Sequence, residues 1–303
     1  MPVKLQKWQR NALYGLFAFL AFVFALRQTA PIEAVKERLV MEAAAQGWTL
    51  TVADVRPAGL AGVGMSGVTL ESREGLRIPI ERVDATLRFS SLLLGRRGLA
   101  FDAQLFEGRM KGFVEEKGPR RRLAAQISGV DLSRAVPLRK AIGVDVAGIV
   151  GGDLDLVLDE KDPATSAGHV DLAVRDAAVN GGQTPVPGMG GALTLPKMAI
   201  GQITAHGAVK DGRLTFDKLE AKGDDVEAAG DGLYVMMQPR MAFAPVFGKA
   251  RLKLRDTFWA KPGASGFKPI IEAALAPARA RDGAYGFQIF GTLSAPQARM
   301  AAQ

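Results

Sequence analysis

Residues 148–159, GIVGGDLDLVLD, alternate leucine with aspartate over most of their length. The leucines are Leu154, Leu156 and Leu158, and the aspartates are Asp153, Asp155 and Asp159. Successive side chains of a β-strand point to opposite faces, so this stretch predicts a strand with one apolar face and one solvated face. The alternation returns at residues 83–89, which indicates a sheet with the same two faces.

Further short strand candidates follow one another along the chain. Together with residues 148–159 they are residues 48–55, 67–71, 81–89, 98–106, 109–115, 123–128, 168–175, 202–209, 213–221, 226–235, 249–255 and 285–293. Asp211-Gly212, Asp282-Gly283 and Asn180-Gly181-Gly182 are typical of hairpin turns. Few connections are long enough for a crossover helix, so antiparallel neighbours are favoured. The prediction is a mainly β (α+β) fold with one long, mostly antiparallel sheet.

A few short helices and two loops complete the expected organisation. Residues 31–47 predict a helix, because a proline opens the stretch, apolar residues share one stripe and a glycine ends it. Shorter helical stretches are expected at residues 90–94 and 131–143. Residues 183–195, rich in proline and glycine, predict a loop or linker, and residues 261–269 predict a weaker one. The first loop separates two halves of the β domain, residues 33–182 and 196–303.

The composition excludes several kinds of chemistry. The 303 residues include no cysteine, which removes disulfides, thiolate zinc sites and thiol nucleophiles. His169 and His206 are the only histidines, so a histidine-dependent hydrolase would need one of them. The protein is therefore predicted not to be an enzyme, with no catalytic, cofactor-binding or metal-binding residues. The net charge of +8 favours an anionic neighbour, either phospholipid or nucleic acid.

The N-terminal residues predict the compartment. Residues 1–10 carry Lys4, Lys7 and Arg10 without an acidic residue, and residues 11–26 carry no charge. An uncharged stretch beyond Arg27 extends the apolar segment to residue 32, about 30 Å of helix if the arginine reaches the interface.

The prediction is a transmembrane anchor at residues 11–32 with a cytoplasmic tail at residues 1–10. The alternative is a cleaved secretory signal, but the stretch lacks a good cleavage site. The expected location is the bacterial inner membrane, single-pass, with the bulk of the chain in the periplasm. This placement argues against nucleic acid as a partner.

Two sequence motifs resemble ligand-binding sites but are interpreted as structural. Residues 62–67, GVGMSG, match the dinucleotide fingerprint, but a strand rather than a helix is expected after them. They are interpreted as a flexible turn. The acidic residues Asp153, Asp155, Asp159 and Glu160 could suggest a cation site, yet their spacing on a strand predicts a solvated face, and Asp224-Asp225 is interpreted in the same way.

The remaining charged candidates are also given structural roles. His169 and His206 lie at strand starts and are expected to be solvated or hydrogen-bonded. The basic clusters could contact anionic lipid or serve as ordinary turn and edge charges. They are Arg96-Arg97, Arg120-Arg121-Arg122 and Arg139-Lys140.

Several glycine-rich and apolar motifs resemble those of the type II secretion system protein N family of bacteria. They are residues 195–201 (LPKMAIG), 212–216 (GRLTF), 221–232 (AKGDDVEAAGDG), 42–47 (EAAAQG) and 291–296 (GTLSAP). The resemblance spans most of the chain and implies an inner-membrane protein of a secretion machine. It also implies a curved, groove-like β architecture shared with AsmA-like proteins, without an established active site.

Two functions follow from this resemblance and remain open at this point. The first is a non-enzymatic accessory component of type II secretion, which presents a periplasmic β scaffold to partner subunits, with strand-edge pairing as a contact mode. The second is an AsmA-like periplasmic module that binds or transfers lipid. An apolar sheet face would suit lipid, although an ordinary packed core produces the same alternation.

Overall fold

A computed structural model describes residues 48–58, 62–72, 77–136, 144–185, 192–238, 243–293 and 295–301, together with helical positions 37, 40, 41, 43 and 44. Within this part of the chain, fifteen strands form a single sheet. Fourteen of them lie side by side in sequence order, and β9 pairs only with β8. Every pairing is antiparallel, which confirms the mainly β, antiparallel prediction.

The strands vary from four to nineteen residues in length. They are β1 (Trp48–Ala58), β2 (Gly62–Ser72), β3 (Arg77–Leu87), β4 (Arg97–Leu105), β5 (Gly108–Lys117), β6 (Arg120–Asp131), β7 (Val144–Asp159), β8 (Ala167–Pro185), β9 (Ala192–Leu195), β10 (Met198–Lys210), β11 (Arg213–Lys222), β12 (Val226–Met236), β13 (Val246–Leu254), β14 (Tyr285–Thr292) and β15 (Ala295–Met300).

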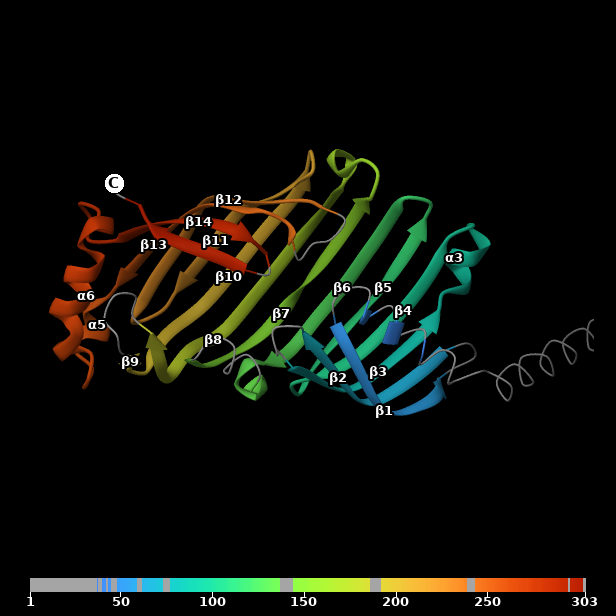
Figure 1. The fold of residues 1–303 in the computed structure, drawn as a ribbon, viewed down its shortest axis with the longest axis horizontal. Helices are drawn as coiled ribbons and strands as arrows, with labels where there is room; N and C mark the ends of the chain where they lie inside the picture. Colours follow the sequence, from blue (N-terminus) through green and yellow to red (C-terminus); the bar gives the residue numbers. More distant parts are fainter. Residues whose placement is uncertain are drawn as a thin grey trace, which may run out of the picture.

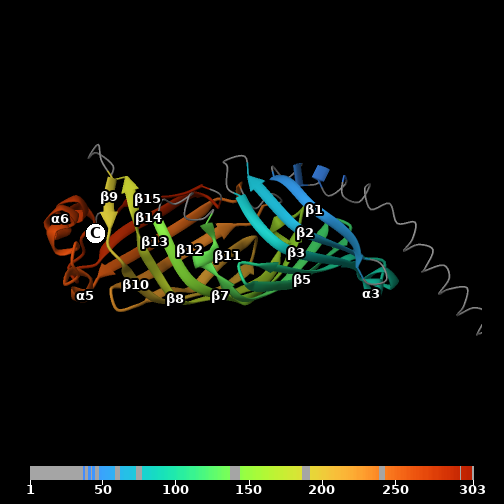
Figure 2. The same ribbon diagram turned by 90° about the horizontal axis from the view of Figure 1, so that it is seen from below.

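Short helices lie near the two ends of the sheet. Figures 1 and 2 show one long curved sheet with α3 (Phe89–Leu93) near one end and α5 (Asp256–Trp259) and α6 (Lys268–Leu275) at the other. The helix expected at residues 90–94 is therefore confirmed to within one residue. Of the stretch expected at residues 131–143, the described part forms a 3-10 turn, Leu132–Arg134, capped by the Asp131 side chain.

Two expected turns are wrong, and two expected loops are corrected where the structure describes them. Residues 62–67 form the first half of β2 and not a flexible turn. Gly67, at φ 58°, kinks this strand, so that Met65 and Val68 pack in one cluster although they are three residues apart. Asn180-Gly181-Gly182 lies inside β8 and is not a hairpin turn.

The other two corrections concern the proposed linkers. The expected loop at residues 183–195 is partly a hairpin, because β8 continues to Pro185 and β9 pairs back onto it. The expected loop at residues 261–269 instead contains a 3-10 turn, Ser265–Phe267, and the start of α6. Proline and glycine predict a loop in both stretches, but proline also opens helices and occurs at the ends of strands.

Side chains of like polarity line up across the sheet because the strands pair in register. One row contains Leu87, Leu99, Val114, Leu123, Leu156, Gly168, Val209, Leu214, Val235 and Val246. The next contains Pro57, Val63, Ala85, Phe101, Gly112, Ala125, Leu154, Val170, Gly207 and Phe216. A third contains Val55, Met65, Val83, Ala103, Met110, Ile127, Gly152, Leu172, Ala205 and Leu219. None of the three rows contains a charged residue, and together they define the apolar face.

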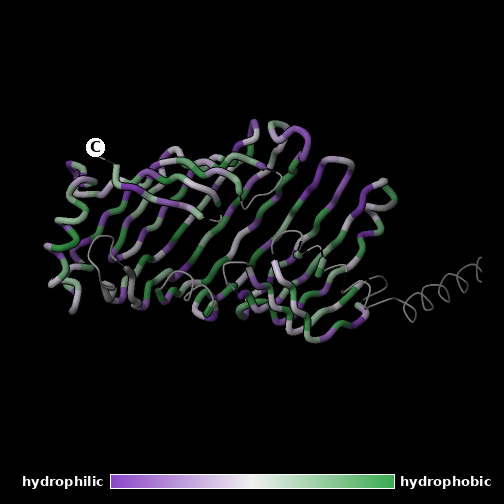
Figure 3. Tube along the Cα trace, viewed as in Figure 1, coloured by the Kyte–Doolittle hydropathy of each residue, from purple (hydrophilic) through white to green (hydrophobic). Residues whose placement is uncertain are grey.

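The alternate residues of the same strands define the polar face. One of its rows contains Asp84, Asp102, Lys111, Gln126, Asp153, Asp171, His206 and Lys218. Figure 3 shows hydrophilic and hydrophobic positions alternating along the strands. The predicted separation of leucine from aspartate in β7 is thus confirmed and extends over most of the sheet.

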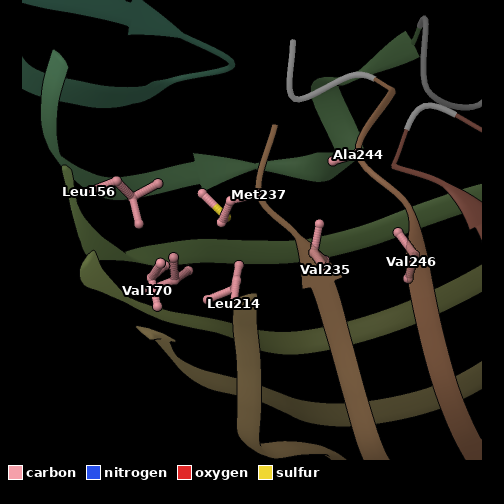
Figure 4. Close-up of a cluster of buried hydrophobic side chains, with 8 residues drawn as sticks. Leu156, Val170, Leu214, Val235, Met237, Ala244 and Val246 are labelled. Atoms are coloured by element: carbon pink, nitrogen blue, oxygen red, sulfur yellow. The ribbon is translucent and has the colours of Figure 1, made fainter. Parts of the chain in front are cut away.

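The sheet curls with its apolar face inside. Strands β8, β10 and β11 separate β7 from β12, yet Met237, directly after β12, lines the same small cleft as Leu158 of β7. Only a sheet that curves toward its apolar face can bring these two residues together. Figure 4 shows Met237 between the side chains of Leu156, Leu214 and Val235 on that face.

The core fills one half of the apolar face. Its largest cluster draws buried residues from β7 to β13 and the turn after β12: Leu156, Val170, Val209, Leu214, Val235, Met237, Ala244 and Val246. A second cluster joins β1 and β2, and a third packs α5 against the end of the sheet. Strands β4, β5 and β6 contribute no residue to these clusters of buried side chains.

The predicted anchor at residues 11–32 and tail at residues 1–10 lie outside the described residues. Within the described part, no helix has the length and apolarity needed to cross a bilayer. Positions 37, 40, 41, 43 and 44 are helical, in agreement with the helix expected at residues 31–47 where that stretch is described.

Candidate functional site

Over strands β3 to β6 the first row of the apolar face is partly open, although Ala103 (3% exposed) and Ala125 (8% exposed) in the other two rows are buried. Along the first row, Leu87 is 49% exposed and Leu99 39%, whereas Leu214 is 7% and Val235 2% exposed. Phe101, Val114 and Leu123 are half-buried, although they too belong to the apolar face. Residues of this kind are normally covered in a folded protein, and large uncovered apolar areas mark binding surfaces. We call the apolar face of β3–β6 the open half.

The dimensions of the open half suit a hydrocarbon chain. Neighbouring strands lie roughly 4.8 Å apart, so four of them present about 15 Å of apolar surface across the sheet. In the three rows its residues are aliphatic, aromatic, methionine or glycine, whose side chains offer no strong hydrogen bond to a polar ligand. The favourable free energy of covering it with methylene groups is about 0.8 kcal/mol per group.

The polar face is covered by ion pairs between neighbouring strands. Arg122 donates two hydrogen bonds to Asp155, at 2.9 and 2.5 Å, and Arg109 binds Asp102 in the same bidentate way, at 2.7 and 2.5 Å. The hydrogen bond from Arg122 lowers the pKa of Asp155, and that from Arg109 lowers the pKa of Asp102. These exposed pairs each add little stability, but they keep the polar face ionised and hydrated.

Helix α3 is fixed to the polar face through Glu115. This buried carboxylate accepts hydrogen bonds from Ser91 Oγ at 2.6 Å and from Arg88 at 2.8 Å. The Ser91 hydroxyl, followed by the charges of Arg88 and Arg96, lowers the pKa of Glu115. Among the described residues, every resolved carboxyl pKa shift is downward.

The outer side of α3 exposes apolar residues beside arginines. Leu93 is 88% exposed, Leu94 65% and Phe89 55%, and Arg96 and Arg97 follow directly. Exposed leucine and phenylalanine next to arginine is the combination that inserts into an anionic bilayer surface. Of the basic pair, Arg96 is engaged by Glu115, and Arg97 is exposed.

Asp225 corrects the interpretation of Asp224-Asp225 as a solvated pair. Asp224 is exposed, but Asp225 is only 1% exposed, between β11 and β12. Its carboxylate accepts a hydrogen bond from the backbone N–H of Ala199 at 2.5 Å and one from Lys261. Burial raises the pKa of Asp225, but the bonds from Lys261 and Ala199 outweigh it and lower the pKa overall. Asp225 therefore joins β10, the β11–β12 turn and the helical end of the sheet.

The acidic residues of β7 have different partners. Asp155 binds Arg122, and Asp159 binds Arg120 and accepts backbone N–H bonds from Lys161 and Asp162. Asp153 instead contacts His169. Asp155 has the structural role that the spacing predicts, whereas the side chain of Asp159 is only 9% exposed and is not solvated as predicted.

Both histidines are exposed and hydrogen-bonded, as expected, but the structure also brings them together. His169 contacts Asp153 and His206 contacts Asp171, on three neighbouring strands. The sequence interpretation missed this grouping, because it depends on the pairing of β7, β8 and β10.

The fold and its open half define a class of protein: a single, curled antiparallel sheet with one apolar and one polar face. No protein-family model, curated protein or solved structure matches the chain. The resemblance to the type II secretion protein N family therefore rests on the quoted motifs, and the functional argument on the geometry.

Proposed function

We propose that this protein is a non-enzymatic lipid-binding module of the bacterial cell envelope, which holds an acyl chain on the open half of its apolar face. The observation that supports this most is the contrast within one in-register row, where Leu87 and Leu99 are exposed and Leu214 and Val235 are buried. A packed core explains the buried part of the row. It does not explain why the same row is exposed at Leu87 in β3 and Leu99 in β4.

The polar surroundings support the same proposal. An acyl chain on the open half leaves its headgroup at the rim of the sheet, close to water. The exposed apolar residues of α3 and the arginines after them provide a contact for an anionic membrane surface, the source from which lipid would enter. An inner-membrane anchor at residues 11–32 would hold the sheet beside that surface.

The test is the lipid content of the purified protein. We expect native mass spectrometry of the full chain, extracted from membranes in mild detergent, to show bound phospholipid or fatty acid after the detergent is exchanged. A single-sheet protein of similar size that lacks an open apolar face, purified in parallel, controls for carry-over. A protein that carries no lipid and gains none from mixed phospholipid vesicles would contradict the proposal.

A scaffold of the type II secretion system is the second candidate, favoured by the last strand. Every residue of β15 is exposed, and among the described strands β15 pairs only with β14. Such an edge can accept a strand from another protein. Isolation of the protein with secretion subunits, lost when Gln297→Pro interrupts β15, would support this candidate and would leave the lipid content unchanged.

A further inference from the structure

The two histidines and two aspartates of the polar face form one compact group. Strand pairing places Asp153 of β7 opposite Asp171 of β8, and Asp171 opposite His206 of β10. His169 lies in the next row, opposite Asp155. Three neighbouring strands thus supply all four side chains from the same face, although the residues are up to 53 positions apart.

Asp153, His169 and Asp171 lie close enough together to share one ion, and His206 reaches them through its contact with Asp171. His169 Nε2 lies 3.2 Å from Asp153 Oδ2, and His206 Nδ1 contacts Asp171 Oδ1. One possible ligand atom from each of Asp153, His169 and Asp171 lies within 4.8 Å of the others. Ligand bonds of about 2.0–2.2 Å need these atoms slightly closer together. The side chains of the group are about half exposed and can rotate that far.

The neighbouring cationic side chains are engaged by other carboxylates and do not occupy the four residues of the group. Arg122, the nearest arginine across β7, is held by both carboxylate oxygens of Asp155. Lys218, opposite His206 in the register, is 3.9 Å from Glu220. Asp155 itself is engaged by Arg122. Asp153 is therefore the β7 carboxylate that can bind the same ion as His169.

The backbone also brings the strands close at this place. Gly168, immediately before His169, has φ 146°, and a Cβ there would lie 2.1 Å from the carbonyl oxygen of Asp155. Only glycine permits this approach of β8 to β7. His169 and Asp171 follow this close approach on β8, which pairs with β7 on one side and β10 on the other.

We propose that Asp153, His169, Asp171 and His206 bind one divalent transition-metal ion, with Zn²⁺ as the representative ion. Two imidazoles and two carboxylates are a nitrogen and oxygen ligand set that suits zinc or copper, whereas calcium and magnesium prefer oxygen alone. The ion ties β7, β8 and β10 together on the polar face, opposite the apolar core. This site is independent of lipid binding, because the two faces of a strand carry different side chains.

The experiment uses untagged full-length protein, since a histidine tag would bind the same ions. We expect competition with a chromophoric chelator to show one Zn²⁺ per chain, and thermal melts to show a higher midpoint with Zn²⁺ than with Ca²⁺. The variants His169→Asn and His206→Asn should each weaken Zn²⁺ binding by more than about tenfold, since even outer-shell partners of metal ligands contribute 10–100-fold. Without Zn²⁺, both variants should melt close to the wild type, because their side chains are exposed.

Two results would overturn the metal site. One is the absence of stoichiometric Zn²⁺ binding to the wild type at micromolar concentrations. The other is equal binding by the wild type and by His169→Asn/His206→Asn, which would place the ion elsewhere. Asp102→Asn, in the same polar row but bound to Arg109, is the matched control and should leave Zn²⁺ affinity unchanged. Loss of lipid in the mass spectra would not affect any of these outcomes.

Discussion

The double variant Leu87→Glu/Leu99→Glu is expected to lose lipid binding while it stays folded. The two leucines face each other across β3 and β4 on the open half, and both are exposed. An acyl chain laid on them would have to cover two carboxylates. Placing an acidic side chain in hydrocarbon costs about 3 kcal/mol, which alone lowers the affinity by more than about a hundredfold.

The matched control adds the same two charges to the other face of the sheet. Gln104 and Gln126 are exposed on the polar face, in β4 and β6. Gln104→Glu/Gln126→Glu should keep the lipid, measured by native mass spectrometry and by transfer of a fluorescent fatty acid. Equal losses in both double variants would show that net charge, and not the apolar face, governs binding. If Leu87→Glu/Leu99→Glu still binds lipid, the lipid does not lie on the open half.

The position of the charges matters for this test. Leu156 is 9% exposed within the main core cluster, and Leu154 packs against that cluster. A charged residue at either position would unfold the sheet and report only on stability. The open half permits the same chemical change without disturbing the buried core.

Asp225→Ala is expected to cause the largest loss of stability among single polar substitutions. It leaves Lys261 and the Ala199 N–H without their carboxylate partner and disconnects β10 from the helical end. Removing one partner of a buried ion pair costs about 3–5 kcal/mol, and because Lys261 is one-third exposed we expect about 3 kcal/mol. The expected fall in melting temperature is on the order of 5–10 °C. Asp224→Ala, at the exposed neighbouring residue, should melt as the wild type does.

The effect of Asp225→Ala should depend on pH. The pKa of Asp225 is lowered in the folded protein, so its contribution is complete above the pKa of an unfolded aspartate, about 3.9. That contribution disappears as the pH falls through the lowered folded value. Urea unfolding of the two proteins should therefore give a constant difference from about pH 5 to 8 and a smaller one near about pH 3. A difference that grows on acidification would contradict the ion pair.

The alternation in β7 was sufficient to predict the sheet and its two faces, because it reflects local geometry. The alternation did not predict the curl of the sheet, and only the family resemblance implied a curved architecture, because the curl depends on distant segments such as Leu158 and the turn after β12, which line one cleft. For the same reason the alternation alone could not show which part of the apolar face is covered. The sequence of a strand indicates which of its residues share a face, but not which other segments cover that face.

The burial of Asp225 and the helical end depend on distant residues. Asp225 is buried because Lys261, 36 positions later, and Ala199, 26 positions earlier, meet it. Pro269 lies in the first turn of α6, where proline favours a helix, so the proline that predicts a loop is equally compatible with a helix start. The grouping of the β7 and β8 residues could have been predicted from the sequence. A hairpin centred on residue 162 places Asp153 opposite Asp171, two residues after His169.

Photo-crosslinking from a single strand tests the central claim most directly. A benzophenone side chain replaces either Phe101, on the apolar face of β4, or Gln104, on its polar face, and the cells are irradiated before purification. We predict that the position-101 protein carries a covalent phospholipid adduct, seen by mass spectrometry, and that the position-104 protein does not. Adducts at both positions or only at position 104 would contradict an acyl chain on the open half.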